Sequence, residues 1–317
     1  MPTKLILDVD TGTDDAVAIM LAALHPDLDL VGVTTVTGNA LVDVTTENTL
    51  RVLDHIGVAV PVFCGSVKPL ARDDLPVPRA TPPPGKTYAH GTYLELPEAR
   101  SAPQARRAVE FLIDTFADGA TETVLVATGP LTNVALALRA EPRLADWIPR
   151  TVIMGGAHRT GNITPRAEFN MWADPEAARV VLGAGLRNVT LVTLDATHQA
   201  LVSANDAAAF RDLGTPAGVA MAGLTERRIA GYDARLGNQA RHAAPIHDAL
   251  CVAALIRPDI ISCVDLFVDV ETNGALTTGE TVIDVDHRLK HAANASVAFG
   301  ANASLFISLL LGAFAGA

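Results

Sequence analysis

Four aspartates lie within eight residues near the amino terminus of this 317-residue chain: Asp8, Asp10, Asp14 and Asp15. They fall between an apolar run at residues 4–7, which predicts a buried strand, and residues 16–24, which predict a helix. Carboxylates this close repel one another unless a cation or hydrogen bonds hold them, and oxygen-only ligands favour Ca²⁺ or Mg²⁺. Helix capping explains Asp14 or Asp15 but leaves Asp8 and Asp10 unexplained, so the cluster predicts a divalent metal site.

A second polar group surrounds Pro165, where residues 161–170 read Gly-Asn-Ile-Thr-Pro-Arg-Ala-Glu-Phe-Asn. Asn162, Glu168 and Asn170 supply two amides and one carboxylate, which suit paired hydrogen bonds to the neighbouring hydroxyls of a sugar. A turn stabilised by asparagine side chains explains the same residues about equally well. Taken alone, this segment leaves both interpretations open.

Two histidines stand at positions that chemistry could use. His247 and Asp248 begin a predicted helix, where they are either a metal ligand with an adjacent acid or a structural histidine with a capping acid. Taken alone, that pair favours the structural interpretation. His90 lies in a proline-rich segment, residues 67–97, which is either a lid or a surface loop. Three glycine-containing segments follow predicted strands and indicate a close backbone approach: Gly38-Asn39, Thr128-Gly129-Pro130 and Met154-Gly155-Gly156.

These residues need elements that bring them together, and the chain alternates short apolar runs with helical segments. Strands are predicted at residues 4–7, 30–36, 58–63, 123–127, 151–154 and 189–194, with late strands at 266–270, 281–285 and 295–299. Helices are predicted at residues 16–24, 44–56, 105–116, 131–138, 204–211, 217–229 and 246–256, and another opens at Asp174-Pro175-Glu176. The alternation predicts an α/β fold: a doubly wound, mostly parallel central sheet flanked by helices, with the active site at the carboxyl ends of the strands.

Composition limits the class of protein. Hydrophobic residues make up 49% of the chain and no linker or repeat interrupts it, so residues 1–317 are expected to form one domain. A net charge of −11 argues against a nucleic-acid polymer or a membrane as partner. Three cysteines without metal-ligand spacing favour the cytoplasm. The uncharged residues 305–317 are too few to span a bilayer and predict a buried or interface-facing helix, which favours a homodimer or homotetramer.

Six segments occur in a specific order along the chain: residues 8–16 (Asp-Val-Asp-Thr-Gly-Thr-Asp-Asp-Ala), 38–39, 128–133 (Thr-Gly-Pro-Leu-Thr-Asn), 154–156, 162–170 and 247–248. Together they resemble the nucleoside hydrolases of the inosine–uridine-preferring type. The resemblance runs from Leu5 to beyond Asp248, and residues 270–274 and 279–284 also look like the tail of that family. It implies hydrolysis of the N-glycosidic bond of ribonucleosides, with a purine, a pyrimidine or both as base, to give the free base and ribose.

The resemblance also implies a binding role for each matching residue. One Ca²⁺ would be bound by three carboxylates and one backbone carbonyl: those of Asp10, Asp15, Asp248 and Thr128. The small-molecule nucleoside would be held at its ribose by polar side chains and one methionine: Asp14, Asn39, Asn162, Glu168, Asn170 and Met154. Within this set, Asp14 would take the 2′ position, with Asp248 at the 3′ position.

Three residues carry the catalytic roles that the resemblance implies. Cleaving an N-glycosidic bond builds an oxocarbenium-like ribosyl cation, which carboxylates beneath the ring stabilise. Asp10 would act as general base on a calcium-bound water. His247 would face the base and protonate it as it leaves, and His90 would sit on a loop that closes over the site.

Two other functions stay open at this stage. Asp8-x-Asp10 after a strand is similar to the haloacid-dehalogenase-type phosphatases, but Gly12 stands where those enzymes want Thr or Val. A non-catalytic nucleoside-binding protein would keep the same pocket, and only an activity measurement separates it from the enzyme. Base preference is not predicted, because Tyr232 does not align cleanly with the tyrosine pair that family members often carry ahead of the His-Asp.

Overall fold

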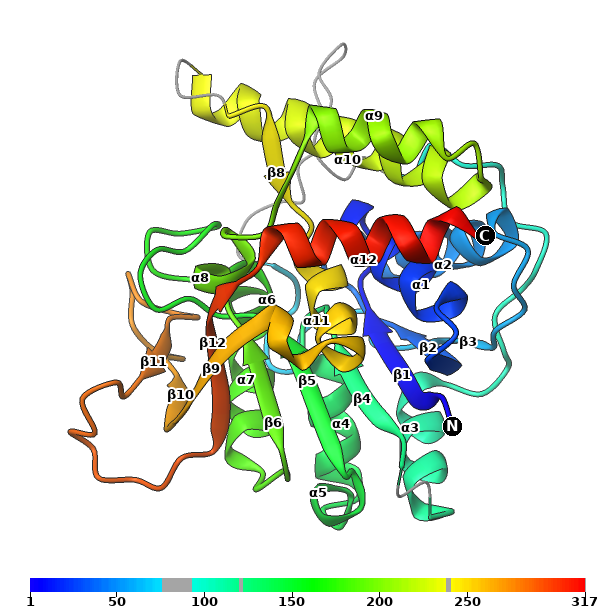
Figure 1. The fold of residues 1–317 in the computed structure, drawn as a ribbon. Helices are drawn as coiled ribbons and strands as arrows, with labels where there is room; N and C mark the ends of the chain where they lie inside the picture. Colours follow the sequence, from blue (N-terminus) through cyan, green and yellow to red (C-terminus); the bar gives the residue numbers. More distant parts are fainter. Residues whose placement is uncertain (76–92, 120–121, 238–240, 317) are drawn as a thin grey trace.

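The apolar runs become the strands of one eight-stranded sheet (Figure 1), in a computed structural model that describes residues 1–75, 93–119, 122–237 and 241–316. The strand order is β3-β2-β1-β4-β5-β6-β12-β9, and neighbours are parallel except for β12 and β9. The strands are β1 (Thr3–Val9), β2 (Leu28–Thr35), β3 (Val62–Cys64), β4 (Val124–Ala127), β5 (Arg150–Met154), β6 (Val189–Val192), β9 (Ile261–Leu266) and β12 (Ala295–Ala301). The predicted α/β class with a mostly parallel central sheet is confirmed.

Helices cover both faces of this sheet, which is why its central strands are continuous apolar runs. Leu5 and Leu7 of β1 face one core, shared with α1, α2, α11 and α12, whereas Ile6 faces a second core shared with α3, α4 and α7. The helices are α1 (Thr13–Leu24), α2 (Val42–His55), α3 (Ala108–Ala117), α4 (Thr132–Ala140), α5 (Leu144–Trp147), α6 (Phe169–Ala173), α7 (Pro175–Gly183), α8 (Leu194–Thr197), α9 (Ala204–Asp212), α10 (Pro216–Leu236), α11 (His247–Ile256) and α12 (Ala303–Ala315), with a short 3₁₀ turn at Pro258–Ile260.

The order of the strands reverses direction at β1, which lies between β2 and β4. In open α/β sheets, ligands bind outside the carboxyl ends of the strands at such a switch point. β1 ends at Val9, directly before Asp10, and β4 ends at Ala127, directly before Thr128. Asn39 follows β2 at the same edge. The topology therefore gathers the predicted polar residues where a ligand is expected.

The late strands differ from the prediction in one respect. The strand expected at residues 266–270 is divided between β9, which ends at Leu266, and β10 (Val268–Val270). The side chain of Asn294 accepts a hydrogen bond from the Val268 N–H and donates one to its carbonyl oxygen, and this satisfies the backbone where the chain leaves the sheet. β10 pairs with β11 (Thr281–Ile283) in a separate antiparallel hairpin, which lies to the left of the sheet in Figure 1.

The terminal helix α12 is confirmed, and it packs against the rest of the chain through Phe306, Leu310 and Phe314. Above it in Figure 1 lie α9 and α10, which stand in the chain between the two strands of a short antiparallel pair, β7 (Leu201–Ser203) and β8 (Ala243–Pro245). The Thr215 hydroxyl caps the first turn of α10 and donates a hydrogen bond to the Phe314 carbonyl oxygen. In the part of the chain that the structure describes, no helix combines the length and the apolar character needed to cross a membrane.

Candidate functional site

Two helix amino termini place three carboxylates against one another. Asp14 and Asp15 lie in the first turn of α1, and Asp248 lies in the first turn of α11, which packs beside α1. Each offers a carboxylate oxygen, and these oxygens all lie within 4.8 Å of one another. All three side chains are buried. Helix amino termini favour negative charge, and the buried Arg228 pairs with Asp14, but three buried carboxylates carry more negative charge than this one cation compensates.

Asp10 lies beside this group at the end of β1. Its Oδ2 accepts a hydrogen bond of 2.6 Å from the Asn39 N–H, and the Asn39 side chain donates to the Asp10 carbonyl oxygen at 3.3 Å. Gly38 makes this approach possible, because a Cβ at that position would stand 2.1 Å from Asp10 Oδ2. Asn39 therefore acts on Asp10 through its backbone as well as its side chain.

The electrostatics of the cluster favour a bound cation. Burial, and then the charges of Asp15 and Asp14, raise the pKa of Asp10 well above its ordinary value. Burial together with Asp14 raises the pKa of Asp15 to about 7, and the pKa of Asp248 rises for the same reasons. A hard divalent cation among these oxygens would reverse the cost of ionising them. The donor set therefore fits Ca²⁺ or Mg²⁺.

Thr128 holds Asp15 in place. Its hydroxyl donates to Asp15 Oδ1 at 2.9 Å, and the Gly12 N–H donates to Asp15 Oδ2 at the same distance. The Thr128 carbonyl oxygen accepts a hydrogen bond of 2.7 Å from the side-chain amide of Asn170. The structure thus brings Thr128 and Asn170 to the acidic group, as predicted, although their roles toward a metal or a sugar stay predictions.

The segment around Pro165 also delivers its polar residues to this edge of the sheet. Glu168 caps α6 by accepting from the N–H groups of Asn170 and Met171, and it also accepts from the Gly156 N–H after β5. Burial raises the pKa of Glu168 to about 7. Asn162 Oδ1 accepts from the backbone of the same segment, at the Phe169 N–H. These are the contacts of the turn interpretation, and they hold the segment in a fixed shape.

Met154 completes this side of the site. Its backbone oxygen and its sulfur lie 3.2 and 3.5 Å from the Asn170 side-chain nitrogen. Met154 ends β5, so Asn170 joins the carboxyl ends of β4 and β5. The predicted sugar residues Met154, Glu168 and Asn170 are therefore neighbours in the folded chain.

His247 is held from two sides by hydroxyl groups. Thr197 Oγ1 lies 2.7 Å from His247 Nδ1, and the Tyr232 hydroxyl lies 3.0 Å from His247 Nε2. The imidazole is buried, with the His198 ring at 5.6 Å between centroids. His247 directly precedes Asp248, so one turn of α11 carries both the acid of the cluster and an oriented histidine.

The sequence of this chain matches one known protein family over nearly its whole length. The model of the inosine-uridine preferring nucleoside hydrolases matches residues 5–308. The chain belongs to that family. The expected family and enzyme class are thus confirmed, and the phosphatase alternative is set aside.

Individual nucleoside hydrolases are similar along almost the whole chain. The pyrimidine-specific ribonucleoside hydrolase RihB of Escherichia coli is 38% identical over 307 residues, 97% of this chain and 95% of that protein. The inosine-uridine preferring nucleoside hydrolase of Leishmania major is 41% identical over 286 residues, 90% of this chain and 88% of that protein. The purine-preferring ribonucleoside hydrolase of Gardnerella vaginalis has a solved structure with a TM-score of 0.89 and 31% identity, covering 99% of this chain and 98% of that one.

Sequence reasoning missed Arg228 and left the role of Tyr232 open at this nucleoside hydrolase site. Arg228 and Tyr232 lie four residues apart on one face of α10, and both reach the group formed by Asp14 and His247. The i, i+4 spacing was visible in the sequence, but nothing there indicated that this face of the helix points at the site. His90 lies outside the described residues.

Asp8 belongs to the scaffold in the folded chain. Its Oδ1 accepts hydrogen bonds from the Thr34 hydroxyl at 2.6 Å and from the Asn133 side chain at 2.7 Å. Burial raises the pKa of Asp8 to about 6. These bonds tie β1 to β2 and α4 next to the acidic cluster.

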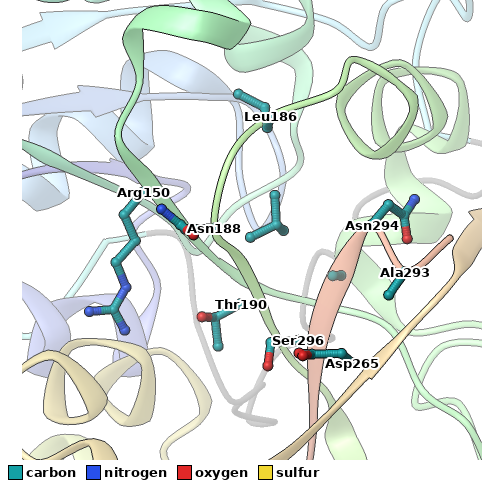
Figure 2. Close-up of a pocket in the computed structure, with 10 residues that line it drawn as sticks. Arg150, Leu186, Asn188, Thr190, Asp265, Ala293, Asn294 and Ser296 are labelled. Atoms are coloured by element: carbon teal, nitrogen blue, oxygen red, sulfur yellow. The ribbon is translucent and has the colours of Figure 1, made fainter.

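Figure 2 shows a separate pocket of about 450 Å³ at the opposite edge of the sheet, where β5, β6 and β12 begin. Arg150, Thr190, Asp265 and Ser296 are among its lining residues. Among the described residues that line it, Asp265 is the single acid, so this pocket offers no counterpart to the cluster at the carboxyl ends.

Proposed function

We propose that this protein hydrolyses the N-glycosidic bond of ribonucleosides to free base and ribose, with Ca²⁺ bound at the acidic cluster. The observation that carries the proposal is the convergence of Asp14, Asp15 and Asp248 beside Asp10 at the switch point of a nucleoside hydrolase sheet. Purine- and pyrimidine-specific enzymes both occur among the similar proteins, so the proposal covers either type of base.

Asp10, Asp15 and Asp248 would hold the calcium ion through their carboxylates, with the backbone carbonyl of Thr128. All four groups are oxygen donors, and they lie at the ends of strands or in the first turns of helices. When bound, Ca²⁺ would neutralise the cluster and lower the pKa of a coordinated water. Asp10 would then accept the proton of the attacking water, because its carboxylate lies at the end of β1 beside the other acids.

The ribose would be held by the polar residues around the cluster. Asp14 would accept a hydrogen bond from the 2′-hydroxyl and Asp248 from the 3′-hydroxyl. Carboxylates at these positions stabilise the positive charge that develops on the sugar as the bond to the base breaks. Asn39, Asn162, Glu168, Asn170 and Met154 would orient the rest of the sugar, which converts binding energy into alignment.

The leaving base would be received by His247. The hydroxyls of Thr197 and Tyr232 fix both ring nitrogens, so the imidazole is oriented before the substrate arrives. His247 Nε2 would pass its proton toward the base through the Tyr232 hydroxyl, which lies 3.0 Å away, and this removes the cost of expelling an anion.

A cytoplasmic location and a homodimer or homotetramer complete the proposal. The three cysteines are free, which agrees with a reducing compartment. Size-exclusion chromatography with light scattering measures the number of subunits.

A nucleoside panel tests the proposed reaction. Purified protein is incubated with inosine, guanosine, adenosine, uridine and cytidine, with either Ca²⁺ or a calcium chelator, and free base and ribose are quantified. Base release that the chelator abolishes and Ca²⁺ restores is the expected result. Release that continues unchanged after complete removal of the metal would contradict the calcium role, and no release from calcium-loaded protein would leave a binding function instead.

A further inference from the structure

Arg228 is a fully buried arginine in the middle of α10, with 2% of its side chain exposed. Its Nε donates to the Pro245 carbonyl oxygen at 2.9 Å, and its Nη1 donates to the Thr13 hydroxyl at 3.0 Å. Nη1 also lies 2.7 Å from Asp14 Oδ1. A buried guanidinium is stable only when its hydrogen bonds and its charge are matched, so this arrangement fixes Asp14 and Arg228 together.

Asp10, Asp15 and Asp14 each have a different orienting partner. Asn39 fixes Asp10, and Thr128 with Gly12 fixes Asp15. Among the ion pairs of the described residues, Arg228 contacts this cluster through Asp14. A carboxylate paired with a guanidinium has one oxygen engaged and part of its charge compensated, which makes it a weaker ligand for a cation. Its remaining lone pairs still accept a hydrogen bond from a hydroxyl.

We propose that Arg228 is a positioning residue that reserves Asp14 for the sugar rather than the metal, and thereby sets the preference for ribose over 2-deoxyribose. The inference rests on the proposed function, in which Asp14 accepts a hydrogen bond from the 2′-hydroxyl. Asp14, Asp15 and Asp248 are close enough to serve together as metal ligands. Arg228 distinguishes Asp14 from the other two acids, because the ion pairs of the described residues join it to Asp14 and to neither Asp15 nor Asp248.

A lysine cannot replace this arginine. The guanidinium donates hydrogen bonds through Nε to β8 and through Nη1 to the first residue of α1, and Nη1 also forms the ion pair with Asp14. A single ammonium group keeps the charge but cannot hold the same three groups in fixed directions. Arg228→Lys therefore keeps the positive charge near Asp14 but removes the contacts that orient its carboxylate.

The test compares wild type with Arg228→Lys and Thr13→Val, using uridine with 2′-deoxyuridine and inosine with 2′-deoxyinosine. Arg228→Lys is expected to lower the ribo-over-deoxyribo ratio of kcat/KM by about tenfold, the size of one charged hydrogen bond. Thr13→Val keeps both charges, removes one anchor of Arg228 and is expected to lower the ratio by about threefold. Calorimetric binding of ribose and of 2-deoxyribose to the calcium-loaded protein is expected to show the same loss of preference without turnover.

Arg211→Lys is the matched control. Arg211 also pairs through both terminal nitrogens with an acid, Glu226, but on the exposed surface away from the cluster. The ribo-over-deoxyribo ratio of kcat/KM in Arg211→Lys is expected to equal that of wild type. In an Asp14→Asn background, Arg228→Lys is expected to cause no further change, because it acts through Asp14.

The outcomes separate the inference from the proposed function. If the wild type hydrolyses ribonucleosides and 2′-deoxyribonucleosides equally well, Asp14 has no role at the 2′-hydroxyl, and this inference is overturned as well. If the wild type prefers ribonucleosides and Arg228→Lys keeps the same preference, only the role of Arg228 is overturned. If Arg228→Lys does not fold, an unchanged preference in Thr13→Val overturns that role. A selective loss on the ribonucleosides supports it.

Discussion

Replacing Asp15 by asparagine is expected to stabilise the metal-free protein and to remove its response to calcium. Asp15 is fully buried, and its two oxygens accept hydrogen bonds from the Gly12 N–H and the Thr128 hydroxyl. An asparagine has nearly the same shape: its oxygen can accept from Gly12, and its amide can donate to the Thr128 hydroxyl oxygen. The substitution therefore removes a charge and leaves the local bonds in place.

The magnitude follows from the pKa of Asp15, which burial and Asp14 raise from 3.8 to about 7 in the folded chain. Because the folded state holds this proton more tightly than the unfolded state, the stabilisation is complete below about pH 4 and is lost as the pH rises through 7. Three pH units correspond to about 4 kcal/mol. At roughly 2 cal/mol/K of unfolding entropy per residue, asparagine should raise the midpoint of metal-free unfolding at pH 8 by up to about 6 °C.

Thermal unfolding at pH 5 and pH 8, in chelator or in Ca²⁺, measures both effects. Metal-free wild type should lose stability from pH 5 to pH 8, and Ca²⁺ at about 100 times its Kd should restore about 2.7 kcal/mol. The Asp15→Asn variant should show a weaker pH dependence and little calcium effect. Asp146→Asn, which removes an exposed carboxylate paired with Arg187, is the control. If metal-free Asp15→Asn is less stable than wild type at pH 8, the electrostatic reasoning about the cluster is wrong.

Three further substitutions test the catalytic arrangement by the rate of free-base release. Asp10→Asn should fold normally and lose about 10³-fold in kcat, and a near-normal kcat would exclude Asp10 as the general base. Gly38→Ala would place a Cβ 2.1 Å from Asp10 Oδ2 and should cost most of the turnover, whereas Gly183→Ala, with open space around its Cβ position, should leave kcat unchanged. Tyr232→Phe removes the hydroxyl 3.0 Å from His247 Nε2 and should lower kcat/KM about tenfold; an unchanged pH–rate profile and kcat/KM would argue against its orienting role.

The local part of the site could be predicted from the sequence. Asp10, Asp14 and Asp15 follow a buried strand and open a helix, so their positions relative to one another are fixed by a few backbone torsions. The strand and helix alternation likewise predicted a parallel sheet, and a parallel sheet collects the ends of its strands at one edge. The order of the motifs then predicted the family, which is confirmed.

Other features depend on contacts that only the folded chain makes. Residues 266–270 read as one apolar strand, but the Asn294 side chain divides it by bonding to the Val268 backbone from 26 residues away. Glu168 is well suited to a sugar by its chemistry, yet its observed hydrogen bonds cap a helix. In both cases the sequence shows which side chain is present, but it does not show which backbone groups that side chain will contact.

The difference between what the sequence predicts and what the folded chain decides is largest at α10 and α11. The sequence by itself determined that the amino-terminal acids form a cluster and that His247 and Asp248 begin a helix. Only the tertiary structure decided that α10 turns Arg228 toward α1, across 215 residues of chain from Thr13, and Tyr232 toward His247. The physical reason is that hydrophobic periodicity specifies which face of a helix is buried, whereas the packing of the whole chain decides what that face meets.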